Sequence, residues 1–248
     1  MANPIQQFEI SPIIPLSLGS LDISYTNSSL WMTIAVVLST VFLTLAMRHK
    51  KMVPGRVQVF AEMTYEFVAG MIRDNIGPKG QQYFPLIFTL FMVVLLGNIL
   101  GLVPYSFTYT SHIIVTAVLA FVIFFTVLCI GFYKHGLHFL ELFVPPGMPL
   151  WLTPLIVPIE VLSFFIRPVT LSVRLFANMI AGHIMLKVFA GFSAGMVAMG
   201  LGGVAFGILP MLFNTVLIGF ELLIAFLQAY VFAVLSCIYL KDTVEIGH

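Results

Sequence analysis

The sequence predicts an all-α integral membrane protein with five membrane-crossing helices and one amphipathic helix on the membrane surface. Hydrophobic residues make up 60% of the 248 residues and charged residues 8%, whereas a soluble domain has roughly 25% charged residues. Apolar runs recur along the chain at lengths that match the hydrocarbon core of a bilayer. The few ionisable residues within these runs recur at helical spacing. The length fits a single membrane domain over residues 1–248.

The first part of the chain contains three apolar segments and one amphipathic segment. Residues 30–47 would be about 27 Å long as a helix, which is enough to cross the bilayer once. Residues 54–77 alternate apolar and charged side chains at helical spacing, which predicts an interfacial helix. Residues 83–103 and 113–132 are two further spans, and the aromatic residues of the loop 104–112 favour a position at the membrane interface.

Two longer apolar segments follow, residues 152–190 and 203–240. Each would extend about 57 Å as one helix, nearly twice the thickness of the hydrocarbon core. We therefore expect the two helices to tilt strongly and to form an antiparallel hairpin with its turn near Leu201. Prolines inside the two segments can bend them, namely Pro154, Pro158, Pro168 and Pro210.

The basic residues outside the predicted spans fall on one side of a five-span topology: Arg48, Lys50, Lys51, Arg56, Arg73, Lys79, Lys134 and Lys241. The positive-inside rule identifies this side as the cytoplasm, or the matrix of a mitochondrion, with the N-terminus outside and the C-terminus inside. A net charge of +1 does not favour nucleic-acid binding. Cys129 and Cys237 lie in apolar runs and are expected to be small buried hydrophobes. The sequence therefore predicts no disulfide framework, no metal and no cofactor.

Each long segment carries one polar stripe. The stripes recur every seven residues and consist of Glu160, Arg167 and Arg174 in the first helix, and of Asn214, Glu221 and Gln228 in the second. With the turn near Leu201, His183 would lie near the level of Glu221, and Arg174 near that of Gln228. One explanation is an internal network of salt bridges and hydrogen bonds that holds the hairpin together.

Arg174 favours a different explanation, because its guanidinium cannot give up its proton in a protein. Ala177, Asn178 and Ala181 surround it on a helical wheel, and such small residues allow another helix to approach closely. We expect no carboxylate of this chain at the depth of Arg174. An intramembrane charge without a partner indicates a functional site, and a second subunit is the best source of the missing carboxylate.

The other ionisable groups suit proton transfer. Burial and neighbouring charges can move the proton affinity of Glu160, His183 and Glu221 toward neutral pH. Glu160 lies on the inner half of the hairpin, and His183 with Glu221 on the outer half, so they mark two half-paths that stop short of each other. Asn98 and Asn214 could also line a path, although a lone Asn in a span more often forms an interhelical hydrogen bond.

Two long stretches carry a specific resemblance to a known family. Arg-Pro-Val-Thr-Leu-Ser-Val-Arg-Leu-Phe-Ala-Asn-Met-Ile-Ala-Gly-His (167–183) and Phe-Glu-Leu-Leu-Ile-Ala-Phe-Leu-Gln-Ala-Tyr-Val-Phe (220–232) resemble subunit a of the rotary F-type ATP synthase. The similarity extends to residues 7–9, 98–104 and 110–116, and so to nearly the whole chain. The arrangement is similar to that of alphaproteobacterial and mitochondrial members.

The resemblance implies that Arg174 is the essential arginine of the family, facing a rotating ring of small proteolipid subunits that carry an acidic residue. It places Asn178 and Gln228 beside this arginine. The other implied partners are peripheral-stalk subunits and the lipid bilayer, and the transported ion is the proton. The implied location is the inner membrane of a bacterium, with the mitochondrial inner membrane as the alternative.

The resemblance also implies that Glu160 belongs to an inner half-channel and that His183 and Glu221 belong to an outer one. Many bacterial members exchange the acid and the histidine between the latter two positions, and some carry an acid where Gly101 stands. The chain is then a non-catalytic, proton-translocating stator subunit that couples proton flow to ATP synthesis. It contains no Walker-type phosphate-binding stretch. The alternative function is a self-contained proton-coupled transporter, a class whose folds usually contain internal repeats.

Overall fold

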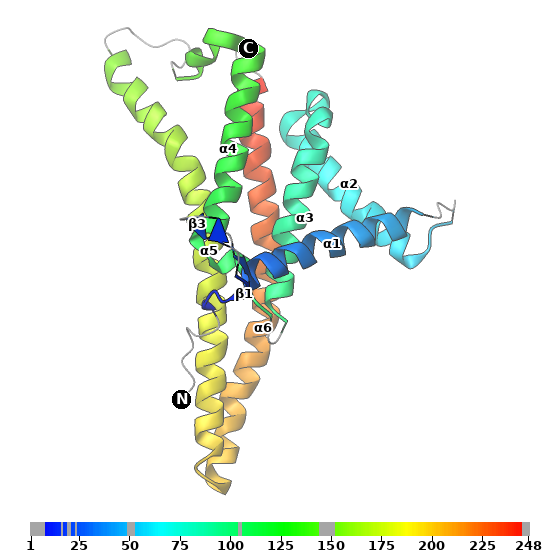
Figure 1. The fold of residues 1–248 in the computed structure, drawn as a ribbon, viewed down its shortest axis with the longest axis vertical. Coiled ribbons are helices and arrows are strands. Elements are labelled where there is room, and N and C mark those ends of the chain that lie inside the picture. The colour runs from blue at the N-terminus through cyan, green and yellow to red at the C-terminus, as the bar shows by residue number, and fades with distance from the viewer. Residues whose placement is uncertain are drawn as a thin grey trace. The chain divides into compact units, whose positions relative to one another are not determined.

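The computed structural model describes residues 8–15, 17–18, 21–22, 24–48, 53–103, 106–143 and 152–244. The main helices in this part of the chain are α1 (Asn27–Met47), α2 (Arg56–Ile76), α3 (Phe84–Gly101), α4 (Ile113–His135), α5 (Thr153–Val197) and α6 (Leu201–Val244) (Figure 1). Three short 3₁₀ helices lie between them: η2 (Pro78–Tyr83), η3 (Tyr109–Ser111) and η4 (Gly136–Phe143).

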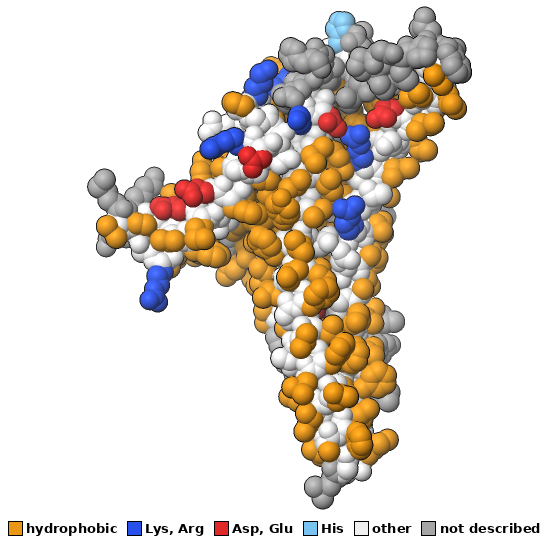
Figure 2. Space-filling view, turned by 180° about the vertical axis from the view of Figure 1, so that it is seen from behind, with side chains coloured by type: hydrophobic (Ala, Val, Ile, Leu, Met, Phe, Trp, Pro, Cys, Tyr) orange, Lys and Arg blue, Asp and Glu red, His pale blue; other side chains and the backbone are white. Residues whose placement is uncertain are grey.

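Within the described residues, five helices are long and apolar enough to cross a membrane: α1, η2 together with α3, α4, α5 and α6. Helix α2 differs from these, because it buries Val68 and Ile72 while Glu66 and Arg73 are exposed. The predicted all-α membrane protein with one amphipathic helix is confirmed. Figure 2 shows hydrophobic side chains covering much of the helical surface in view, which suits contact with lipid tails rather than with water.

The segment before α1 contains two small antiparallel strand pairs that the sequence analysis did not foresee. Strand β1 (Pro12–Ile14) pairs with β4 (Tyr25–Thr26), and β2 (Ser17–Leu18) pairs with β3 (Leu21–Asp22). Strands of two or three residues are too short for a period-2 pattern to stand out in the sequence. Asn27 joins this segment to α1, because its Nδ2 donates to the carbonyl of Glu9 at 3.1 Å.

The chain divides into two compact units, and the first comprises Met1–Leu45, Met92–His112 and Leu175–Ala229. In this unit α5 and α6 run antiparallel and side by side, coloured yellow and orange in Figure 1. Ser193 Oγ donates to the carbonyl of Gly207 at 2.9 Å near the hairpin turn. The turn lies at residues 198–200 rather than at Leu201, which is the first residue of α6. Helix α5 extends to Val197, seven residues beyond the predicted end at residue 190. Gly200, with a φ of +95°, adopts the left-handed conformation that lets the chain turn before α6.

The second unit comprises Ala46–Phe91, Ile113–Arg174 and Tyr230–His248. Its core includes Phe124, Phe139 and Phe164 from α4, η4 and α5. Gly131 makes room for this packing, because a Cβ at that position would overlap the ring of Phe139. Helices α4 and α5 are also joined by a buried hydrogen bond between hydroxyls, those of Thr116 and Ser172 at 3.1 Å. A single membrane domain over the whole chain stays a prediction.

Two aromatic residues of the loop between α3 and α4 are buried, while the predicted position of this loop at the membrane interface stays a prediction. Phe107 and Tyr109 are buried, with exposed fractions of 7% and 1%. Tyr109 Oη donates to the carbonyl of Val93 at 2.8 Å, and Gly97 leaves space for the ring. Burial raises the pKa of the Tyr109 hydroxyl above its ordinary value. An internal carbonyl satisfies the hydroxyl, so this ring packs inside the unit.

Other sequence predictions have mixed outcomes. Cys237 is buried as expected, but Cys129 is exposed on α4, because it lies on the face of that helix that no described residue covers. Lys50 and Lys51, used in the orientation argument, lie outside the described residues, as do Pro104 and Tyr105 of the α3–α4 loop.

Candidate functional site

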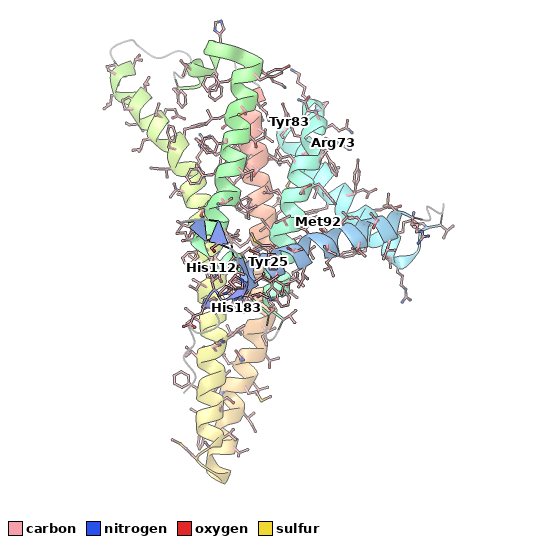
Figure 3. The ribbon with its side chains drawn as sticks, viewed as in Figure 1. Tyr25, Arg73, Tyr83, Met92, His112 and His183 are labelled. Carbon is pink, nitrogen blue, oxygen red and sulfur yellow. The ribbon has the colours of Figure 1, made fainter. Side chains whose placement is uncertain are left out.

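The first unit brings two ionisable side chains from the long helices together. His183 on α5, labelled in Figure 3, and Glu221 on α6 are both almost fully buried. The ring nitrogen Nδ1 of His183 lies 3.9 Å from Oε1 of Glu221. Gly182 makes this approach feasible, because a Cβ there would stand only 2.5 Å from the same carboxylate oxygen. The prediction that His183 lies near the level of Glu221 in the hairpin is therefore confirmed.

The other ring nitrogen of His183 contacts a residue that the sequence analysis did not select. Nε2 lies 3.0 Å from Oγ1 of Thr108, a buried residue in the connection that follows α3. The same hydroxyl lies 3.2 Å from the carbonyl oxygen of Gly101. Thr108 belongs to no periodic pattern, so no sequence signal pointed to it.

An open cleft of about 940 Å³ leads to His183 in this unit. Its walls come from the segment before α1, from α1, from the end of α3 and from α5, and they include the polar residues Glu9, Asn27, Thr108 and Lys187. Lys187 was also missed, although a lysine one turn after His183 in an apolar helix is an available signal. Both carboxylate oxygens of Glu221 are buried, and neither has a hydrogen-bond partner among the described residues. The arrangement can hold a proton between a carboxylate and an imidazole beside a polar cleft.

Asn98 and Asn214 differ in their contacts. Asn98 is fully buried on α3, and its Nδ2 donates to the carbonyl of Ala225 on α6 at 3.2 Å. This contact is the interhelical role that was considered more common. Asn214 is half-buried on α6, and its Oδ1 has no hydrogen-bond partner within the described chain.

The second unit contains a separate charged cluster. Arg167 NH1 lies 2.9 Å from Oδ2 of Asp242, and its NH2 lies 3.8 Å from Oε1 of Glu160. The guanidinium also lies 5.5 Å from the ring centroid of Tyr239 and 5.9 Å from that of Phe164. These side chains are about one-third exposed in the described chain. The internal network considered from the sequence therefore exists around Arg167.

The sequence analysis missed Asp242, although a signal for it was present. The stripe that contains Glu221 and Gln228 continues at the same spacing through Leu235 to Asp242. Leu235 interrupts the polar pattern, which is why Asp242 was not assigned to the stripe.

Arg174 is exposed on α5 and belongs to the second unit. It forms no ion pair or hydrogen bond with any residue of the described chain. Asn178 and Gln228 belong to the first unit, where each is half-buried. Nor do the described His, Cys, Asp and Glu side chains include a group of three that could hold a metal ion.

These features define a multi-pass helical membrane protein with ionisable side chains inside its apolar helices. A family model described as ATP synthase A chain matches residues 29–241, so the chain belongs to that family.

Full-length relatives named ATP synthase subunit a come from alphaproteobacteria. A protein from Chelativorans sp. is 56% identical over 246 residues, which cover 99% of each chain. A protein from Mesorhizobium japonicum is 55% identical over 99% of this chain and 98% of its own. One from Agrobacterium fabrum is 53% identical over the whole of both chains.

Proposed function

We propose that this chain is the non-catalytic stator subunit of a rotary ATP synthase that carries protons through two offset half-channels to and from a rotating proteolipid ring. The family membership supports a role in the ATP synthase complex. The residues that conduct protons are inferred from the geometry of the two units and from the resemblance to the family.

The observation that carries this proposal is the isolated charge of Arg174. Glu160, Arg167 and Asp242 have charged partners in their own cluster, whereas Arg174 has none among the described residues although its side chain is exposed on an apolar helix. A permanent cation in hydrocarbon is costly unless it meets an opposite charge. An acidic residue on a ring of neighbouring subunits supplies that charge.

The outer half-channel in this proposal is the cleft that ends at His183. Protons reach the His183–Glu221 pair through the polar walls of the cleft. An imidazole beside a carboxylate can pass a proton between them. Asn214 would line the same route, and Asn98 would hold α3 against α6.

The inner half-channel contains Glu160. Its carboxylate is about one-third exposed and is only the more distant partner of Arg167, at 3.8 Å against 2.9 Å for Asp242. A partly exposed carboxylate that forms only a long ion pair is free to accept protons that leave the ring.

We further propose that the partners are an acidic proteolipid ring and peripheral-stalk subunits, and that the membrane is the bacterial inner membrane. The N-terminus lies outside and the C-terminus lies in the cytoplasm. Labelling of cysteines placed at Ile13 and Tyr133, both exposed, in a Cys129→Ala background checks this orientation. Reaction of both with an impermeant reagent from the same side would contradict it.

The Arg174→Ala variant tests the proposed function in the assembled complex. We expect loss of ATP synthesis in energised vesicles and of ATP-driven proton pumping, because a ring carboxylate then has no cation that makes it ionise. The matched control is Arg73→Ala, which removes an exposed arginine from α2 and should leave synthesis intact. Near-normal ATP synthesis by Arg174→Ala in a complex of normal composition would contradict the proposed stator mechanism. Solute transport by the purified chain alone would instead support the self-contained transporter.

A further inference from the structure

We propose that Thr108 is a positioning residue that holds neutral His183 in its Nε2–H tautomer, so that the ring gains and loses its proton at Nδ1, the atom that faces Glu221. This inference rests on the proposed role of the His183–Glu221 pair in the outer half-channel.

The number of protons available to Thr108 determines the direction of its hydrogen bonds. A threonine hydroxyl has one proton to donate and two lone pairs. The carbonyl of Gly101 can only accept, so the 3.2 Å contact uses the proton of the Thr108 hydroxyl. The 3.0 Å contact with His183 is then satisfied only if Nε2 carries a proton and donates it to Oγ1.

A competing donor to the same carbonyl does not change this assignment. Ser106 Oγ lies 3.1 Å from the Gly101 oxygen but 2.7 Å from the Val103 oxygen. A carbonyl oxygen has two lone pairs, so the Gly101 carbonyl can accept from Thr108 whether or not Ser106 also donates to it.

The backbone around Thr108 indicates that its hydroxyl is turned away from its usual local partner. Thr108 occupies the N-cap position of η3 in an extended conformation, yet it makes no capping hydrogen bond. A threonine at this position ordinarily accepts a hydrogen bond from a backbone N–H of the helix that it caps. Ser111 closes the turn instead, with its Oγ donating to the Thr108 carbonyl at 2.6 Å. Departures from local preferences such as capping are expected at functional sites. The missing cap therefore fits a Thr108 hydroxyl that serves the His183–Glu221 pair.

The surroundings of Thr108 hold its side chain in place. Its exposed fraction is 5%, although the residue also lines the cleft that leads to His183. A Cβ on Gly101 would stand 2.5 Å from Oγ1 of Thr108. The absence of a side chain at Gly101 therefore allows this hydroxyl to approach α3.

With Nε2 held by Thr108, Nδ1 is the nitrogen that exchanges protons. The O–H bond of a protonated Glu221 breaks as an N–H bond forms at Nδ1, which leaves a carboxylate beside an imidazolium, and the reverse step restores the neutral pair. Proton transfer occurs directly at a donor–acceptor distance of about 2.6–3.2 Å or through one bridging water. The observed distance of 3.9 Å between Nδ1 and Oε1 is longer, so direct transfer requires the two side chains to approach. Lys187 from α5 and Glu9 from the segment before α1 line the same cleft and contribute the other charges near the ring.

Three variants in the full ATP synthase complex test the proposal. Thr108→Val keeps the shape of the side chain and removes the hydroxyl, whereas Thr108→Ser keeps the hydroxyl. Thr110→Val is the matched control, because Thr110 lies two residues further in the same connection and is fully buried, and its hydroxyl has no partner among the described residues. The measurements are ATP-driven proton pumping in vesicles and ¹⁵N NMR of the histidine rings.

We expect Thr108→Val to lower the pumping rate about tenfold, the lower end of the range known for losing a partner that orients a metal-ligating histidine. Thr108→Ser should restore most of the rate, and Thr110→Val should keep it. The His183 signal, assigned by its absence in His183→Gln, should show protonated Nε2 and unprotonated Nδ1 in the unmodified protein, and mixed tautomers in Thr108→Val. Equal rates and equal spectra for Thr108→Val and Thr110→Val would overturn the inference.

The same experiment separates failure of this inference from failure of the proposed function. Loss of pumping in His183→Gln together with normal behaviour of Thr108→Val would reject only the role of Thr108. Full pumping in His183→Gln would reject the outer half-channel itself and, with it, the reason for positioning the ring.

Discussion

Nδ1 of His183 and Oε1 of Glu221 face each other at 3.9 Å between antiparallel helices, and the exposed fractions of the two residues are 8% and 4%. An isolated charge in such a buried position is costly, so each group lowers the cost of ionising the other. Two groups that interact by more than about one pK unit bind protons as a pair rather than one by one. The pair is therefore the natural unit for mutational tests.

Exchange of the two side chains should be tolerated better than either single replacement. His183→Glu alone places two acids together, and Glu221→His alone places two imidazoles together, whereas the double variant restores one of each. ATP-driven proton pumping in membranes measures the effect, with assembly verified for each variant. A double variant no better than the worse single variant would show that the two positions do not share a site.

Gly182→Ala should slow proton pumping with little effect on assembly. The added Cβ would stand 2.5 Å from Glu221 Oε1, so the carboxylate must move away from its present position beside His183. Gly191→Ala is the matched control on the same helix, because a Cβ added there would meet no atom within 4 Å and alanine favours a helix. Equal pumping by the two variants would contradict the close fit of the carboxylate against α5.

Glu160→Gln should slow proton pumping, while Asp242→Asn should act mainly on the local ion pair. Asp242 is the nearer partner of Arg167, but both side chains are partly exposed, so the pair should contribute no more than about 1 kcal/mol to stability. Pumping rates and the thermal stability of the assembled complex distinguish the two effects. If Glu160→Gln pumps normally in a well-assembled complex, Glu160 has only a structural role in the cluster around Arg167.

His112 should make stability fall as the pH is lowered. Its ring stacks on Phe107 with centroids 5.1 Å apart, and burial lowers its pKa below the ordinary value of 6.5. The unfolded chain then binds the proton more tightly than the folded one, so stability is fully present above the unfolded pKa and is lost as the pH falls below it.

The variant His112→Phe keeps an aromatic ring against Phe107 and cannot titrate. Between about pH 7.5 and about pH 5.5, its melting temperature should fall less than that of the unmodified complex. The variant has no side chain at position 112 that takes up a proton on unfolding. Identical falls in the two proteins would show that His112 titrates equally in the folded and unfolded states.

The membrane class, the approximate limits of the long helices and the isolation of Arg174 all follow from the amino-acid sequence. These are local properties, since the length of an apolar run matches a bilayer thickness and the spacing of polar residues follows the helical period. The antiparallel hairpin also brought His183 to the level of Glu221, because a short turn restricts how two long helices can pair.

The pairing of the polar groups, in contrast, could be seen only in the folded protein. Thr108 contacts His183 across 75 positions of the sequence, and Arg167 reaches Asp242 across the same separation. No periodicity encodes such contacts, because they depend on the axial offset and rotation of helices that small residues such as Gly101 and Gly182 allow to approach closely. Tyr109 turned inward for the same reason, since Gly97 on α3 left room for its ring and a helix carbonyl accepted its hydroxyl proton.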